Sequence, residues 1–425
     1  MMAEDEKMRE FEGKDGMMYI GGVPVGDIAD EFGTPVYVTD EARLRENYRN
    51  IRDAFSRYMD TRIHYACKAN TSLAVLNALR QEGSGIDAVS VGEVMTCLRA
   101  GFLPKDIMYT GVNVSTEELK KVVETGVMIN VDSRCELERL AEIDNTLPIS
   151  FRVTPEVGSG HSDKVITGSK GAKFGIPKKE VEDTYARAVE LGFDIKGIHA
   201  HIGSGGQDIS PFEDEMAVLA KMVNGIEDRT GVKLEFIDIG GGVGVPYRPN
   251  ETVMPLNELA SCVTEIMEME TNVRTIVLEP GRFIIADAGV LLTRCNDIKD
   301  TGVKKYVGVD AGFNTLIRPA MYDSYHHVVV GNKFYRACTD RFDIAGPICE
   351  TGDYLAHGRV LPDPHIGDIL AVYDAGAYGY SMSSRYNSRP LCAEVMVNNG
   401  KAELIRERET MEDQWRHQIV PERLR

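Results

Sequence analysis

Short apolar runs alternate with longer amphipathic stretches between residue 63 and about residue 285. Several of the runs are almost continuously apolar, as parallel strands buried on both faces require. The stretches between them place apolar residues three and four positions apart, which predicts helices. The expected strands lie near residues 63–67, 86–89, 107–110, 128–131, 149–153, 196–200, 235–238 and 275–279. Eight such alternations favour a closed (β/α)8 barrel over an open sheet.

The ends of these helices carry their own chemical signals. Three serines, each followed three residues later by a glutamate, predict capping boxes at helix starts: Ser90, Ser115 and Ser133. Gly101 and Gly126 stand where two of the helices should end, because glycine readily adopts the left-handed conformation that closes a helix.

The pattern of apolar and polar residues changes after about residue 285. The segments that follow, such as KYVGVDAG and GDILAVYDAGAYG, are short, strand-like and separated by turn residues. We therefore expect an α/β protein in which a TIM-like barrel (residues 37–284) precedes an all-β domain (residues 285–425) of Greek-key or sandwich-like type. Residues 1–36 are expected to pack on the β domain.

Composition limits the class of function. Lysine and arginine number 48 and aspartate and glutamate 66, which gives a net charge of −18 without any basic cluster. Nucleic acid and anionic membrane are therefore not expected as partners. The charged N-terminus does not have the pattern of a signal peptide, and no apolar run approaches the ~18 residues that span a bilayer. Eight singly scattered cysteines indicate a reduced, cytoplasmic protein without a metal site.

Lys68 stands in the sequence HYACKAN, directly after a run that predicts a buried strand. One interpretation is a charge that emerges at the strand end. The other is a desolvated amine that acts as a nucleophile, since burial lowers the pKa of a lysine. In a barrel, Lys68 would lie at the C-terminal end of the first strand, where barrel enzymes carry their active sites.

Three later strand ends should meet Lys68 at the same mouth: HAHIGSGG (199–206), DIGGGVG (238–244) and EPGR (279–282). The second is not a dinucleotide fingerprint, because the last glycine of that motif would fall on Val245. Its backbone N–H groups, with Ser204 and Gly205 of the neighbouring turn, suit a single phosphate. Purely structural turns remain an alternative.

Glu279 and His201 also have two interpretations each. In the purely structural interpretation, Glu279 forms a salt bridge with Arg282 and His201 is a hydrogen-bonded core histidine. Together, however, an amine, a phosphate cradle, a flat ring and an acid match the needs of pyridoxal phosphate. This cofactor requires a lysine for attachment, a partner for its pyridine nitrogen and a phosphate pocket.

The chain resembles the fold-type III pyridoxal-phosphate decarboxylases, and within them the diaminopimelate decarboxylases, over nearly its full length. The resemblance rests on a set of motifs: HYACKAN, HIGSG, DIGGG, EPGR, VDAGFNTLIRPAMYD, GPICETGD and DAGAYGYSMSSRYNSRP. It implies a barrel joined to a β domain, in agreement with the pattern of strands and helices.

The resemblance also implies roles around pyridoxal phosphate. Lys68 attaches the cofactor, His201 rather than His199 stacks on its ring, and Glu279 pairs with the pyridine nitrogen. The phosphate is expected to bind to residues of four motifs: Ser204, Gly240, Gly241, Gly242, Gly281, Arg282 and Tyr378.

For the substrate, Arg282 and Arg318 with the hydroxyl of Tyr322 make a site for a distal carboxylate. Glu350 matches a neighbouring ammonium group, and Tyr378 is a further expected substrate ligand. A carboxylate and an ammonium at the far end describe meso-2,6-diaminopimelate, whose decarboxylation yields L-lysine.

By resemblance, Cys349 is the acid that reprotonates the α-carbon; the alternative is a small buried thiol. The resemblance also places GPICE at the interface of a homodimer, so that each site would use Cys349 and Glu350 of the partner chain.

Three other functions remain open. A related decarboxylase would act on carboxynorspermidine or on a basic or D-amino acid. A non-catalytic paralogue should have lost Lys68 or Cys349, and this chain keeps both. A cofactor-carrier barrel would lack the C-terminal β domain.

Overall fold

Eight parallel strands form a closed barrel in the computed structural model of the chain, which describes residues 8–158 and 167–425. Each strand pairs with the next along the chain, and the last pairs with the first. The strands are β5 (Asp60–Ala66), β6 (Gly85–Ala88), β7 (Ile107–Tyr109), β8 (Met128–Val131), β9 (Pro148–Thr154), β11 (Asp194–His199), β12 (Phe236–Asp238) and β13 (Thr275–Leu278). The barrel and all eight expected strands are confirmed. A two-residue strand, β10 (Ile176–Pro177), pairs with β9 in addition.

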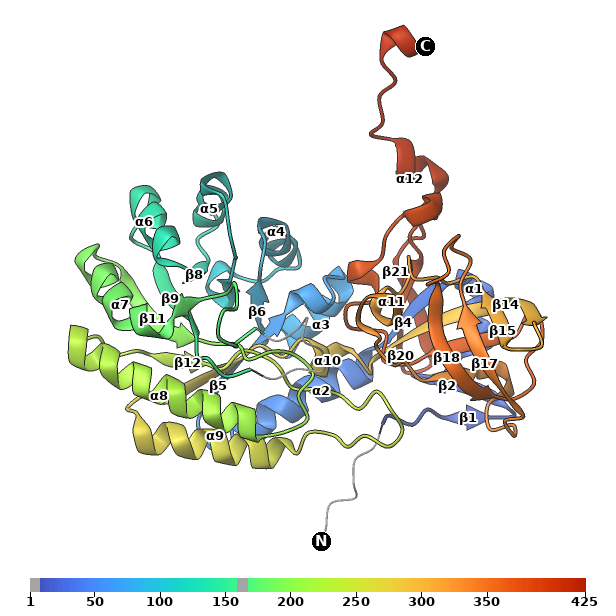
Figure 1. The fold of residues 1–425 in the computed structure, drawn as a ribbon, viewed down its shortest axis with the longest axis horizontal. Helices are drawn as coiled ribbons and strands as arrows, with labels where there is room; N and C mark the ends of the chain where they lie inside the picture. The colour runs from blue at the N-terminus through green and yellow to red at the C-terminus, as the bar shows by residue number, and fades with distance from the viewer. Residues whose placement is uncertain (1–7, 159–166) are drawn as a thin grey trace. The chain divides into compact units, whose positions relative to one another are not determined.

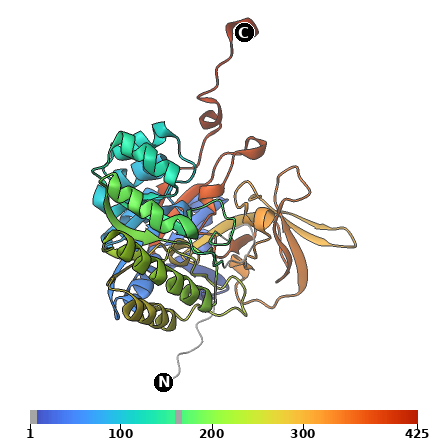
Figure 2. The same ribbon diagram turned by 60° about the vertical axis from the view of Figure 1, so that its left-hand side comes forward.

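Helices follow the strands and lie outside the barrel (Figures 1 and 2). They are α2 (Glu41–Phe55), α3 (Leu73–Gln81), α4 (Val91–Arg99), α5 (Thr116–Val123), α6 (Arg134–Ile143), α7 (Val181–Glu190), α8 (Ser210–Thr230), α9 (Leu256–Glu270) and the short α10 (Arg282–Ile285). Within the described part of the chain, no helix combines the length and the apolar character needed to cross a membrane.

The three predicted serine caps are present, but the capping boxes differ from the expected form. The hydroxyl of Ser90 accepts the N–H of Glu93 at 3.2 Å, and Ser115 and Ser133 do the same for their helices. The carboxylate of Glu93, however, accepts from the N–H of Val89, one residue before the cap, at 2.8 Å. The caps therefore also fix the strand end that precedes the helix, on the side of the barrel that carries Lys68.

The second unit of the chain is built on a nine-stranded sheet, as expected for the β domain. Most pairings are antiparallel, but β15–β17 and β4–β20 are parallel. The strands are β4 (Val36–Asp40), β14 (Gly289–Asp300), β15 (Lys305–Val309), β16 (Val328–Val330), β17 (Asp340–Ala345), β18 (Tyr354–Leu361), β19 (Ile369–Val372), β20 (Ala393–Asn398) and β21 (Lys401–Arg406). A small sheet and three helices complete the unit: β1 (Gly13–Lys14), β2 (Met17–Ile20), β3 (Val23–Pro24), α1 (Val25–Phe32), α11 (Arg318–Tyr322) and α12 (Met411–Trp415).

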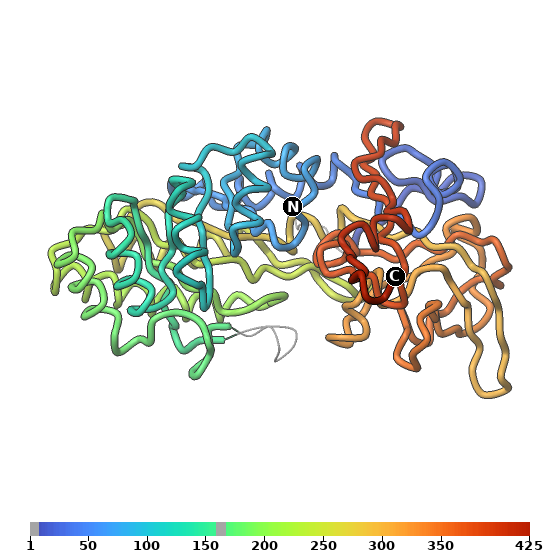
Figure 3. Tube along the Cα trace, turned by 90° about the horizontal axis from the view of Figure 1, so that it is seen from above, coloured from blue at the N-terminus to red at the C-terminus, as the bar shows by residue number. Residues whose placement is uncertain are grey.

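The N-terminal segment contributes more to this unit than the sequence suggested. β4 lies between β14 and β20, so residues 37–44, expected at the start of the barrel, belong to the second unit. In Figures 1 and 3 the blue N-terminal segment runs among the orange C-terminal strands. Every residue of β4 is buried, which requires a strand along each of its edges. A short segment between β12 and α9, Tyr247–Glu251, also belongs to this unit.

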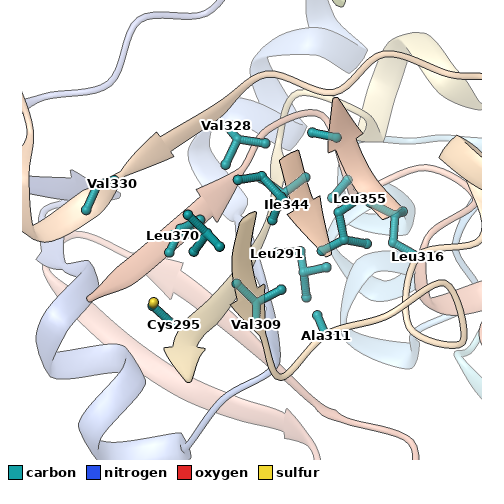
Figure 4. Packing of buried hydrophobic residues seen from close by; sticks show 14 of the residues in the cluster. Leu291, Cys295, Val309, Ala311, Leu316, Val328, Val330, Ile344, Leu355 and Leu370 are labelled. Carbon is teal, nitrogen blue, oxygen red and sulfur yellow. The ribbon is translucent and has the colours of Figure 1, made fainter. Parts of the chain in front are cut away.

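The core of the second unit is aliphatic. Side chains from β14, β15, β16, β17, β18 and β19 meet in one cluster, which includes Leu291, Val309, Ile344 and Leu370 (Figure 4). Burial of such side chains contributes roughly 1.5–3 kcal/mol each, so this cluster accounts for much of the stability of the sheet.

Candidate active site

Lys68 lies just beyond the C-terminal end of β5, in a turn of 3-10 helix (Cys67–Ala69). Its Nζ donates to Oδ2 of Asp87 at 3.0 Å. The carboxylate of Asp87, at the end of β6, is buried, whereas 38% of the Lys68 side chain is exposed. The amine is therefore held by a buried acid and is still reachable from outside the barrel.

The pKa of Asp87 is set by its burial and by the charges of Glu279 and Lys68. Burial raises the pKa of Asp87, the negative charge of Glu279 raises it further, and Lys68 opposes both effects. An acid in this position exchanges a proton more readily than an exposed aspartate and fixes the direction of the Lys68 side chain.

Glu279 follows β13 and is buried against His199 of β11. Oε2 of Glu279 lies 3.2 Å from Nε2 of His199. Burial alone would raise the pKa of Glu279, but its interactions with His199 and Lys68 outweigh burial and hold the pKa well below the usual range. Glu279 is therefore ionised at neutral pH. The alternative for Glu279 was a salt bridge with Arg282; in the structure its partner is His199 instead.

The two histidines of HAHIGSGG have different surroundings. Nδ1 of His199 lies 2.6 Å from Nδ2 of Asn130, so His199 is bound on both sides within the barrel. Nδ1 of His201 accepts the N–H of Gly241 at 3.2 Å. Burial lowers the pKa of His201 well below its ordinary value, and the charge of Lys68 lowers it further. His201 is thus a neutral ring.

The glycine-rich turns after β11 and β12 pack on each other. The N–H groups of Gly205 and Gly206 donate to the carbonyl of Gly242 at 3.0 Å. Gly240 and Gly242 have positive φ, where side chains are strained, and a Cβ on Gly241 would stand 2.4 Å from the carbonyl oxygen of Glu279. The packing itself therefore requires all three glycines.

Arg282 joins these turns to the start of α10. It is buried, and its Nε and Nη2 donate to Oγ of Ser204 at 3.2 and 3.0 Å. Gly281, just before it, packs against Ala66 at the end of β5. Arg282 and Ser204 thus form one cationic, hydroxyl-bearing corner of the barrel mouth.

A third acid, Asp238, completes the buried centre. His199, Asp238 and Glu279 offer ligand atoms within 4.8 Å of one another, a spacing that would also suit a metal ion. Burial and the negative charge of Glu279 raise the pKa of Asp238 well above its usual range. Because a raised pKa favours the neutral form of Asp238, the centre is a poor cation site and is better described as a hydrogen-bonding network around Glu279.

The second unit carries the remaining predicted residues. Arg318, at the start of α11, is buried; its Nη1 donates to the hydroxyl of Tyr247 at 2.9 Å and lies 3.1 Å from Nε2 of His326. Tyr322 ends α11 and is half-buried. Tyr378 is half-buried too and has a positive φ of 57°, an unusual conformation for a tyrosine.

Cys349 and Glu350 lie in the connection between β17 and β18 and are both exposed. The N–H of Cys349 donates to Oδ1 of Asn387 at 3.0 Å, and the hydroxyl of Tyr386 donates to the carboxylate of Glu350. The exposed thiol differs from the small buried thiol that was the alternative for Cys349.

Comparison with known proteins agrees with this arrangement. Residues 41–286 match the family described as pyridoxal-dependent decarboxylase, pyridoxal binding domain. The chain is 50% identical to the diaminopimelate decarboxylase of Methanothermobacter thermautotrophicus, over 96% of this chain and 97% of that protein. The chain belongs to the diaminopimelate decarboxylase family.

Two further members of the diaminopimelate decarboxylase family extend the comparison. The Archaeoglobus fulgidus enzyme is 41% identical over 97% of this chain and 99% of its own. The crystal structure of diaminopimelate decarboxylase from M. jannaschii in co-complex with L-lysine matches with a TM-score of 0.92 at 34% identity, covering 98% of this chain and 99% of that chain. We therefore interpret the carbonyl or amino-acid chemistry of the barrel mouth by reference to this decarboxylase family.

Sequence reasoning missed several polar side chains that this decarboxylase buries beside Lys68 and Glu279. They are Asp87, Asn130, His199 and Asp238. Each is a polar residue in the buried C-terminal half of a strand: β6, β8, β11 and β12. A buried polar residue needs a partner, so polar residues at these strand ends were the available signal.

Proposed function

We propose that this chain decarboxylates meso-2,6-diaminopimelate to L-lysine with pyridoxal phosphate as cofactor. The observation that carries the proposal is the barrel mouth, where a reachable lysine amine, a neutral histidine and an ionised buried glutamate lie together in a member of this family. The L-lysine in the related crystal structure from M. jannaschii supports the expected product.

The residues fit the cofactor at three points. Oε1 of Glu279 is buried and accepts no N–H among the described residues, so it can accept from a protonated ring nitrogen. The amine of Lys68 is accessible for attachment. Arg282 and Ser204, with Gly240, Gly241, Gly242, Gly281 and Tyr378, supply the cation, hydroxyl and close backbone for a phosphate.

When bound, pyridoxal phosphate accepts the electron pair that departing CO₂ leaves behind. The chain's part is to hold the charges in place beforehand. Ionised Glu279 would favour a proton on the ring nitrogen, and neutral His201 would add no positive charge to repel it. Asp87 orients Lys68 and can take or return its proton.

For the substrate, we assign the distal carboxylate to Arg318, with Arg282 and Tyr322, and the distal ammonium to Glu350, with Tyr378 as a further ligand. The guanidinium of Arg318 is already fixed by the hydroxyl of Tyr247, so little side-chain entropy would be lost on binding. Cys349 is assigned as the acid that returns a proton to the α-carbon; its thiol is exposed, as a group that reaches another site must be.

Replacing Arg318 by lysine keeps the charge and removes the planar fork that holds a carboxylate with two bonds. We expect kcat/KM for meso-2,6-diaminopimelate to fall by the equivalent of ~1.5–3 kcal/mol, the range of a hydrogen bond to a charged group. The visible absorbance of bound cofactor should not change. Steady-state kinetics and absorbance spectra of the variant measure both.

The matched control for Arg318→Lys is Arg341→Lys, an exposed arginine on β17, which should keep wild-type kinetics. L-Lysine and L-ornithine lack the distal carboxylate and should be poor substrates of every form. If the wild type decarboxylates them as well as meso-2,6-diaminopimelate, the carboxylate site is misassigned.

We also propose that the active unit is a homodimer in which each site uses Cys349 and Glu350 of the partner chain. Mixing inactive Lys68→Ala with inactive Cys349→Ala chains should restore turnover. Random exchange gives one intact site in half of the dimers, so recovery should reach about a quarter of wild-type turnover. Assays before and after subunit exchange measure it.

The control for the mixing experiment uses Cys338→Ala, another exposed cysteine, which should be fully active alone. No recovery, with exchange verified by mass-tagged chains, would mean that each site is built within one chain.

The test of the function as a whole is product identification. The purified protein is incubated in parallel with meso-2,6-diaminopimelate, carboxynorspermidine, L-ornithine and L-arginine. L-Lysine should form from the first at a rate well above the others. Faster release of CO₂ from any other substrate would favour a related decarboxylase.

A further inference from the structure

The chain ends in a segment, residues 410–425, that leaves the β sheet and has almost no contacts with it. This C-terminal arm begins with a complete capping box of Thr410 and Asp413 at the start of α12 and ends in a 3-10 turn (Glu422–Leu424). Every residue from Trp415 to Arg425 is exposed. In Figures 1 and 2 the red end of the chain runs away from the strands of its own unit.

Hydrogen bonds within the arm are local. For residues 415–425 they run only to residues 412–425 among the described residues, for example from the N–H of Gln418 to the carbonyl of Trp415 at 2.8 Å. The arm therefore has defined local structure, in the cap and the two turns, without a surface of its own unit to pack against.

The arm is mostly polar, but it also exposes several large apolar side chains. Its five large apolar side chains are all exposed: Met411, Trp415, Ile419, Val420 and Leu424. Trp415 is 54% exposed and is the single tryptophan of the chain; Ile419 is 86% exposed. Exposed apolar side chains gathered this closely are typical of a binding surface.

The base of the arm is held by the segment 385–391. Nε2 of Gln414 donates to the carbonyl of Ser388 at 2.8 Å, and Glu409, just before the arm, pairs with Arg385 and accepts the N–H of Leu391. The same segment supplies Tyr386 and Asn387, which bind the loop of Cys349 and Glu350. One short stretch of chain thus supports both the arm and the loop.

Cys349, Glu350, Tyr386 and Trp415 are all exposed, and the loop and the base of the arm are both bound to residues 386–388. If the loop enters the site of a second chain, the arm beside it is presented to that same chain. Charge does not decide the partner: in residues 410–425 three arginines are balanced by two glutamates and one aspartate. The contact would therefore rest on the exposed apolar side chains of the arm.

We propose that residues 410–425 form an arm that binds a second copy of this chain, beside the surface that carries Cys349 and Glu350, and anchors on it through Trp415 and Ile419. The proposal rests on the shared-site dimer of the proposed function. It adds the segment that makes the contact and the residues that supply the affinity.

The single tryptophan allows a direct test on the cofactor-loaded protein. Fluorescence excited selectively in tryptophan reports on Trp415 alone. The protein is diluted through the range in which sedimentation shows association. Trp415 should emit at short wavelength and resist quenching by acrylamide in the dimer, and emit as a water-exposed indole in the monomer. A water-exposed spectrum in the dimer, or a shielded one in the monomer, overturns the proposal.

Variants supply the second measurement. The double variant Trp415→Ala/Ile419→Ala should raise the dimer dissociation constant at least about tenfold, the loss expected for an interface anchor. Turnover per chain should fall on dilution and recover at high concentration. The matched control is Met269→Ala, an equally exposed apolar residue at the end of α9, which should leave association unchanged.

These experiments distinguish failure of the proposal about the arm from failure of the proposed shared-site dimer. If the wild type is an active monomer at every concentration, the shared-site dimer and the arm both fail. If the wild type is a dimer and the double variant dissociates at the same concentration, only the arm fails. A chain ending at Glu409 that is folded by circular dichroism and dimerises as tightly as the full chain also overturns it.

Discussion

Replacing Lys68 by alanine should abolish the visible absorbance of the purified protein and lower turnover by on the order of 10⁴-fold or more, because the group that attaches the cofactor is removed. The side chain is partly exposed and donates to Asp87, so the fold should persist without it. Absorbance spectra, circular dichroism and single-turnover assays measure the three effects.

The matched control for Lys68→Ala is Lys179→Ala, a strongly exposed lysine before α7 that should behave as wild type. Borohydride reduction of the wild type should fix the chromophore to one peptide. If that peptide does not contain Lys68, the central assignment is wrong whatever the activity of the variant.

Replacing Glu279 by glutamine should leave the cofactor bound and lower turnover by ~10²-fold or more, the scale of one well-placed electrostatic partner. Glutamine keeps the shape but cannot hold a proton on the ring nitrogen. Because the pKa of Glu279 is lowered in the folded protein, its ionised form stabilises the fold at neutral pH. That stabilisation decreases progressively as the pH falls below the ordinary glutamate pKa toward the lowered one.

Two readouts distinguish an electronic role of Glu279 from a structural one. Cofactor content, measured after denaturation, should equal that of wild type, whereas the absorbance spectrum should shift. Glu215→Gln, also a buried glutamate of the barrel, is the comparison for a general loss of a buried acid and should retain most of the turnover. Near-normal turnover in Glu279→Gln would exclude its assigned role.

The sequence predicted the barrel well because its signals are local. Most of the eight strands are short and largely apolar, and the serines before α4, α5 and α6 mark helix starts whatever the rest of the chain does. β4 was misplaced because its partners, β14 and β20, lie about 250 and 350 residues further along the chain. No local pattern encodes a pairing at that separation.

The same distinction between local and long-range signals applies to the candidate active site. Lys68 and Glu279 were identifiable because each is a charged residue at the end of an apolar strand. Their partners were not, since the contact of Lys68 with Asp87 and that of Glu279 with His199 join different strands across the barrel mouth. Which charged groups meet there depends on strand order and register, which only the folded chain defines.

From residue 8 onward the chain passes between its two units four times, after residues 44, 246, 251 and 285. A fragment of residues 286–425 would contain β14 and β20 without β4, the strand that joins them, and would lack Tyr247, the partner of Arg318. A single crossover between related genes would therefore transfer only part of the second unit. β14 and β20 would then have to pair with the β4 of the other parent, and Arg318 with its residue at position 247.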